Sequence, residues 1–128
     1  TGPEPPVGIS VPQAMYDDFV KISEPIQKIR PDYPFEVKVR EPRKRPTRMG
    51  GTDASVFAIE GVPTLGFTTE DFKGYDFDYG EIWHTERDLY TKNIPEYQEH
   101  TATVTAIIAL GVANLDKQLS REGLYTEE

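Results

Sequence analysis

Apolar residues recur every three or four positions in the first third of the chain. They are Met15, Phe19, Ile22, Ile26 and Ile29. This spacing places them on one face of an α-helix, which we expect from Pro12 onward with Ser10 as a candidate cap. Because proline lacks a backbone N–H and clashes with the preceding turn, we expect Pro25 to kink or divide this helix.

The period falls to two at residues 35–39, where apolar and charged side chains alternate in the order Phe-Glu-Val-Lys-Val. Alternation of this kind is typical of a half-buried strand, which we expect at or near the edge of a sheet. Residues 1–12 have no such pattern and contain four prolines and two glycines. We interpret them as an extended entry or linker that holds little core, so that residues 13–128 form the domain.

A short helix, a glycine turn and a strand are predicted in the middle of the chain. Thr52 or Asp53 is a candidate cap for a helix over residues 54–59, which Gly61 would end. The segment 62–67, Val-Pro-Thr-Leu-Gly-Phe, is an apolar run with few polar breaks. Such a run is typical of a strand that is buried on both faces.

The last predicted element is a long amphipathic helix that begins near Pro95 and covers a sheet. Its apolar face comprises Tyr97, Val104, Ile107, Ile108, Gly111, Leu115 and Leu119. Before it, residues 68–93 are rich in acidic and aromatic residues and have no sustained period, as in many functional loops. Together the elements predict an α/β fold, a mixed sheet covered by helices including the long C-terminal helix.

Composition and charge limit the possible classes of protein. A length of 128 residues fits one domain or a large piece of one, and the net charge of -8 disfavours a general affinity for nucleic acid. Five basic residues gather between positions 40 and 48, which we interpret as a solvated loop. No stretch is long and apolar enough for a membrane span, and nothing resembles a signal peptide.

His84 is the candidate metal ligand. The chain has no cysteine and two histidines, so a zinc site here would have to use imidazole and carboxylate groups. Glu81, Glu86 and Asp88 are near enough in sequence to orient the imidazole of His84. Spacing alone favours a surface or satisfied loop histidine at His84, since no second ligand accompanies it. We interpret His100 as a residue on the surface of the terminal helix.

Three short motifs follow one another ahead of the terminal helix. They are Gly-Gly-Thr-Asp at 50–53, Gly-Val-Pro at 61–63 and Ile-Trp-His-Thr at 82–85. Their order, with Asp88 and the helix after them, resembles the C-terminal half of the zinc aminopeptidases that use two co-catalytic metal ions. The resemblance covers most of residues 49–119. It implies that residues 13–128 are the C-terminal portion of an α/β/α sandwich, part of a catalytic domain.

The resemblance also implies roles for individual residues. In that family the histidine of the aromatic-His-Thr loop binds one of two zinc ions, and this role falls on His84. Asp53 would shape the wall of the site, and Asp88 would brace the loop that carries His84. Independently of the family, Tyr75 and Tyr79 alternate with acidic residues. Their loop would either line a pocket for the positive amino terminus of a peptide or pack its rings onto the domain.

Two departures from the family pattern concern specificity. Ala54 stands where many relatives have a histidine directly after the turn aspartate. Trp83 stands where tyrosine is common, and it also matches the related glutaminyl cyclases, whose Trp-His-Thr loop lines a pocket for N-terminal glutamine. The other metal ligands of the family lie in its N-terminal half, to which no part of these 128 residues corresponds. They are a histidine, a bridging aspartate, a Glu-Glu pair and a further carboxylate.

The function implied is that of a zinc-dependent exopeptidase, a hydrolase whose metal-activated water removes N-terminal residues from peptides or proteins. This chain would be inactive alone, because the remaining ligands would come from the upstream part of the catalytic domain. The alternatives are a glutaminyl-peptide cyclase-like enzyme and a non-catalytic binding module that retains the fold. The residues leave the localisation unknown, although the family implies a secreted or periplasmic protein.

Overall fold

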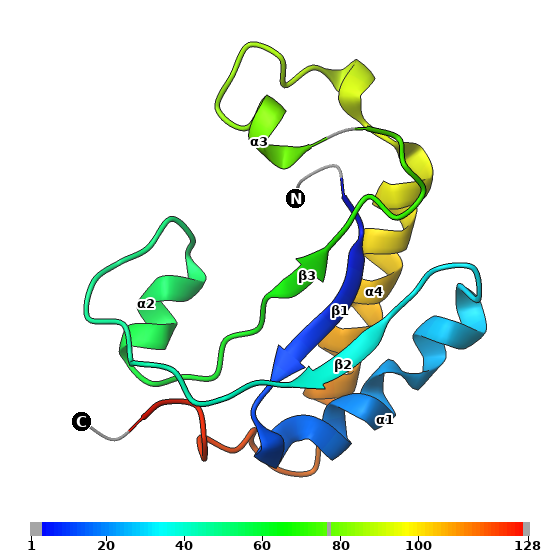
Figure 1. Ribbon diagram of the computed structural model, residues 1–128. Coiled ribbons are helices and arrows are strands. Elements are labelled where there is room, and N and C mark those ends of the chain that lie inside the picture. The colour runs from blue at the N-terminus through cyan, green and yellow to red at the C-terminus, as the bar shows by residue number, and fades with distance from the viewer. Residues whose placement is uncertain (1–3, 77, 127–128) are drawn as a thin grey trace.

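A three-stranded mixed sheet with two long helices on one face forms the centre of the fold (Figure 1). The computed structural model describes residues 4–76 and 78–126. The strands are β1 (Pro6–Val11), β2 (Glu36–Val39) and β3 (Phe67–Thr69), and the helices are α1 (Gln13–Ile29), α2 (Ala54–Ile59), α3 (Tyr79–Ile82) and α4 (Pro95–Ala113), with a 3-10 turn at Tyr90–Lys92. The predicted α/β fold, with a mixed sheet and a long C-terminal helix, is confirmed.

The central strand β1 lies within the proline-rich segment that we interpreted as a linker. It pairs with β2 in parallel and with β3 in antiparallel orientation, so both neighbours are edge strands. Ile9 and Val11 are buried in the core, and the expectation that this segment holds little core is therefore wrong. The prolines are tolerated because Pro6 is the first residue of the strand, beside a shift in register between Pro6 and Gly8.

One apolar core joins α1 and α4 to the sheet. Its buried residues are Ile9, Val11, Met15, Phe19, Ile26, Val37, Val104, Ile108 and Leu124. Pro25 is exposed on α1 and does not divide the helix, which runs unbroken through it. Ser10 is not the cap of α1, because it belongs to β1 and the helix begins after Pro12.

Gly111 on α4 allows a close approach of this helix to α1. A Cβ added there would lie 2.4 Å from Cγ2 of Ile22 and 3.1 Å from its Cβ. We expect Gly111→Ala to lower the free energy of unfolding by about 1–2 kcal/mol, because overpacking outweighs the better helix propensity of alanine. The measurement is urea unfolding. Gly66→Ala is the control, since a Cβ there meets nothing within 4 Å, and equal effects in the two variants would contradict the packing argument.

The segment after α2 differs from its prediction. Helix α2 spans the residues predicted for it, and Gly61, with φ of 70°, ends it as expected. Residues 62–66 form no strand, and β3 has only half-buried and exposed residues. The prediction of a strand buried on both faces is wrong, because β3 is an edge strand and the described helices contact the sheet on one face only.

Several apolar side chains on the outer surface of the fold are exposed. Leu110, on the side of α4 away from the core, is 64% exposed, and Tyr90 in the connection before α4 is 91% exposed. Apolar residues thus lie around much of the circumference of α4 and not on a single stripe. None of the helices in the described ranges has the length and apolar character that crossing a bilayer requires.

Candidate functional site

His84 lies in an exposed turn directly after α3. Its φ of 56° is in the left-handed region, which residues with a side chain rarely adopt. Thr85 holds this turn, since its backbone N–H and its hydroxyl both donate to the carbonyl of Ile82, over 3.1 Å and 3.0 Å. The same hydroxyl accepts the N–H of Arg87 over 3.2 Å. Local hydrogen bonds therefore maintain the unusual backbone that presents the imidazole.

Two aromatic rings continue from His84 along α3. The ring centroid of Trp83 lies 4.4 Å from that of His84, and the ring of Tyr79 stacks on Trp83 at 6.1 Å. Trp83 is 54% exposed and Tyr79 is 46% exposed. The structure thus brings together three of the predicted site residues on an accessible surface. Whether Trp83 and Tyr79 contact a substrate stays a prediction.

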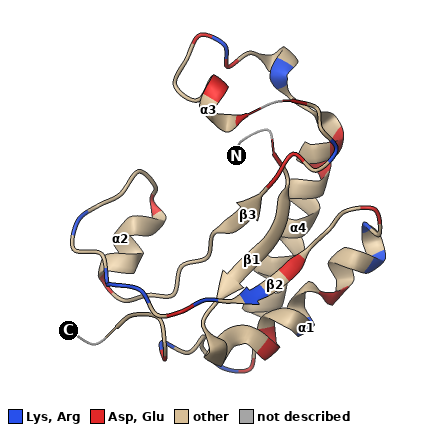
Figure 2. Cartoon of the chain, viewed as in Figure 1, with Lys and Arg blue, Asp and Glu red and all other residues tan. Residues whose placement is uncertain are grey.

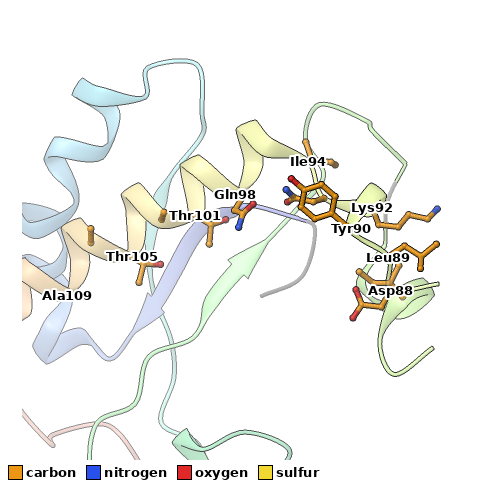
Figure 3. Close-up of a pocket in the computed structure, with 13 residues that line it drawn as sticks. Asp88, Leu89, Tyr90, Lys92, Ile94, Gln98, Thr101, Thr105 and Ala109 are labelled. Carbon is orange, nitrogen blue, oxygen red and sulfur yellow. The ribbon is translucent and has the colours of Figure 1, made fainter. Parts of the chain in front are cut away.

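Asp88 lies between the His84 turn and a cavity of about 730 Å³. Its backbone N–H donates to the carbonyl of Thr85 over 3.2 Å, so its main chain helps to close the turn. The cavity lies between the segment before α4 and the outer face of that helix, including Thr101 and Ala106 (Figure 3). His84 does not line it, so the cavity lies beside the candidate site. The bracing role of the Asp88 carboxylate stays a prediction.

The structure does not bring two other predicted residues to His84. Asp53 is at the N-terminus of α2, which lies well away from α3 in Figure 1. Tyr75 turns toward the first turn of α4, where its ring packs edge-on against Tyr97 at 5.2 Å between centroids. The ring of Tyr75 thus packs against the domain while 45% of the residue stays exposed, and whether it lines a pocket for a peptide stays a prediction.

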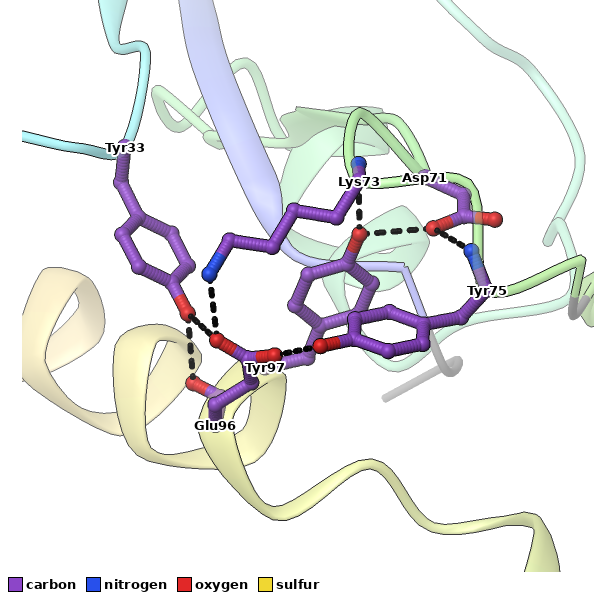
Figure 4. Close-up of polar contacts among 6 residues, drawn as sticks. All are labelled: Tyr33, Asp71, Lys73, Tyr75, Glu96 and Tyr97. Carbon is purple, nitrogen blue, oxygen red and sulfur yellow. Dashed lines mark hydrogen bonds and ion pairs between the residues drawn. The ribbon is translucent and has the colours of Figure 1, made fainter.

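A polar network that sequence reasoning missed holds this loop in place (Figure 4). The carboxylate of Glu96 accepts hydrogen bonds from the hydroxyls of Tyr33 and Tyr75 and pairs with the ammonium group of Lys73. Hydrogen bonds from Lys73, Tyr75 and Tyr33 lower the pKa of the Glu96 carboxyl to about 2. Glu96 thus joins three separate segments, and its position in the first turn of α4 also suits a negative charge.

The hydroxyl of Tyr97 completes the network one residue further along α4. It donates to Oδ1 of Asp71 over 2.6 Å and accepts the backbone N–H of Lys73 over 2.9 Å. Burial and the hydrogen bond to Asp71 raise the pKa of Tyr97 to about 12. The loop that begins at Asp71 is therefore attached to α4 by both Glu96 and Tyr97.

Replacing Glu96 with glutamine should change how stability depends on pH. The folded protein lowers the pKa of Glu96 from 4.5 to about 2. The carboxylate therefore stabilises the fold above about pH 4.5, and this contribution is lost as the pH falls toward 2. We expect Glu96→Gln to be less stable than the wild type at neutral pH and to approach it near pH 2, measured by urea unfolding. The control Glu24→Gln, at an exposed position on α1, should show the same pH dependence of stability as the wild type. The network would be contradicted if the stability of Glu96→Gln also changed with pH as that of the wild type does.

His100 is buried. The interpretation of His100 as a residue on the surface of the terminal helix is therefore wrong. Its ring stacks on Tyr33 at 4.1 Å, and its Nε2 lies 3.2 Å from the carbonyl oxygen of Pro6. Burial lowers the pKa of its imidazole. The sequence held a usable signal, because His100 continues the helical stripe of Tyr97 and Val104. This histidine joins β1 to α4 and takes no part in the candidate site.

The described residues do not by themselves fit a zinc ion. Within ranges 4–76 and 78–126, no three histidine or carboxylate side chains lie close enough together to hold one, whereas zinc sites use three or four protein ligands. No protein-family model, curated protein or solved structure matches this chain. The family resemblance depends on the motifs alone.

Proposed function

We propose that this chain contributes one zinc ligand, His84, to the active site of a zinc-dependent aminopeptidase. The observation that carries the proposal is the His84 turn. His84 is exposed there, and the hydrogen bonds of Thr85 maintain the positive φ of its backbone. Such a conformation costs about 1–3 kcal/mol in a residue other than glycine and occurs preferentially at functional sites. The substrates would be the N-termini of peptides or proteins.

The rest of the metal site would come from protein outside these 128 residues. A lone imidazole holds zinc weakly, so the chain by itself is expected to lack activity. The exposed side chains of Leu89 and Tyr90, which line one hollow with Ala109 of α4, support a larger assembly, since exposed apolar patches mark surfaces that contact other protein. Apolar residues lie around much of the circumference of α4, which also favours burial of this helix on more than one side.

Zinc content and hydrolysis of aminoacyl-anilides by the protein from the complete reading frame test the proposal. We expect zinc to co-purify with that protein and hydrolysis to depend on it, while the 128-residue chain alone shows neither. A complete protein that contains no zinc and releases no amino acid would overturn the enzyme proposal. It would leave the non-catalytic binding module.

Trp83 favours a second candidate, a glutaminyl-peptide cyclase-like enzyme. The indole is 54% exposed beside His84, and its N–H is a hydrogen-bond donor. A peptide that begins with glutamine distinguishes the two activities. Hydrolysis releases free glutamine and shortens the peptide, whereas cyclisation keeps all residues and releases ammonia. Mass spectrometry of the product decides between them.

A further inference from the structure

The basic residues of this acidic protein are concentrated in one short segment, residues 40–48, which we name the basic strip. It contains five basic side chains and one acidic side chain, a net charge of +4, so the other residues together carry -12. Figure 2 shows basic residues, in blue, along the connection between β2 and α2. The protein is therefore strongly asymmetric in charge.

The backbone of the basic strip is attached to the body of the fold. The N–H of Arg40 donates to the carbonyl of Val11 at the end of β1 over 2.9 Å. Arg43 forms a bridge with the C-terminal segment, where its carbonyl accepts the N–H of Thr126 over 3.0 Å. These contacts hold the strip on the surface in an extended form. Binding of a partner would therefore cost the backbone of the strip little conformational entropy.

The charges of the basic strip have no counterions among the described residues. The ion pairs of the described ranges all involve residues outside the strip. Arg45 is used internally, since its guanidinium donates to the carbonyl of Ile59 at the end of α2. A terminal nitrogen of Arg40 is buried without a hydrogen-bond partner in the described structure. Arg43, Lys44 and Arg48 are exposed and can reach an external anion.

We propose that the basic strip binds an acidic, extended segment of a polypeptide, whose carboxylates pair with Arg43, Lys44 and Arg48. Two observations favour a peptide over nucleic acid. The charge of -12 on the rest of the chain opposes a long polyanion. The strip also continues directly from β2, an edge strand of the described sheet, and an edge strand can add a peptide through backbone hydrogen bonds.

Fluorescence anisotropy with a labelled glutamate-rich peptide tests this inference on the 128-residue chain. The test variant replaces Arg43, Lys44 and Arg48 by serine, which keeps the backbone contacts of Arg43. We expect it to bind about tenfold more weakly than the wild type, as the loss of three exposed charge pairs predicts. The matched control replaces Lys21, Lys28 and Arg121 by serine, and it should bind as the wild type does.

Several outcomes would overturn the inference. It fails if the wild type does not bind the peptide, or binds equally well a peptide with glutamine in place of glutamate. It also fails if the control variant loses as much affinity as the test variant, because the effect would then come from net charge alone. Tighter binding of single-stranded DNA than of the peptide would assign the strip to nucleic acid. None of these measurements depends on zinc or on hydrolysis.

Discussion

Replacing His84 by alanine in the complete protein is expected to lower kcat/KM for aminoacyl-anilide hydrolysis by more than about a hundredfold, and to lower the zinc content. Loss of an outer partner of a zinc ligand already costs about 10–100-fold, and the proposal makes His84 a ligand itself. Arg87→Ala is the control, because Arg87 lies in the same exposed turn and contributes only its backbone N–H and carbonyl to the described hydrogen bonds there. Its activity should stay within about twofold to threefold.

His84→Gly separates a functional role of this residue from a structural one. Glycine adopts a φ of 56° without the steric cost that a side chain carries. We therefore expect this variant of the chain to be about 0.5–1 kcal/mol more stable in urea unfolding, while the complete protein loses activity. If His84 served the fold instead, the His84→Gly variant would lose both stability and activity. Unchanged activity in His84→Ala would remove His84 from the site.

The largest expected effect on stability comes from Phe19→Ala, with a decrease of about 3–5 kcal/mol in the free energy of unfolding. Phe19 is fully buried between α1, α4 and the sheet, so truncation removes apolar burial and leaves a cavity. Domains of ordinary size have about 5–15 kcal/mol of total stability. A large fraction of the variant should therefore be unfolded at moderate urea concentrations.

Val20→Ala is the matched control for the core. Val20 is the next residue of the same helix and is 36% exposed, so its truncation leaves no buried cavity and should change stability by less than about 0.5 kcal/mol. Far-ultraviolet circular dichroism during urea unfolding measures both variants. Similar losses for Phe19→Ala and Val20→Ala would contradict the placement of the core.

The helices could be predicted because their signals are local. The apolar period of α1, the glycine after α2 and Pro95 at the start of α4 each depend on neighbouring residues only. The strands were less accessible. Prolines led us to exclude β1 from the core, yet β1 is the central strand because β2 and β3 pair with it from distant parts of the chain.

The candidate site likewise combines features that local sequence predicts with features that only the fold reveals. The motif around His84 predicted this residue as a metal ligand, and Tyr79 and Trp83 are four residues apart, the spacing of neighbours on one face of a helix. The positive φ of His84 and the hydrogen bonds of Thr85 became visible only in the structure. Asp53 belonged to the same family pattern, but the fold places it at the N-terminus of α2, away from the His84 turn.

The sequence by itself determined the periodic helices, the excess of acidic residues, the basic strip and the chemistry available at the His84 turn, because these depend on residue types and short spacings. Only the tertiary structure decided which segments meet. It buried His100 against Tyr33, made β1 the centre of the sheet and attached the Asp71 loop to Glu96 and Tyr97. Contacts between distant residues depend on the packing of the whole chain, so no local pattern specifies them.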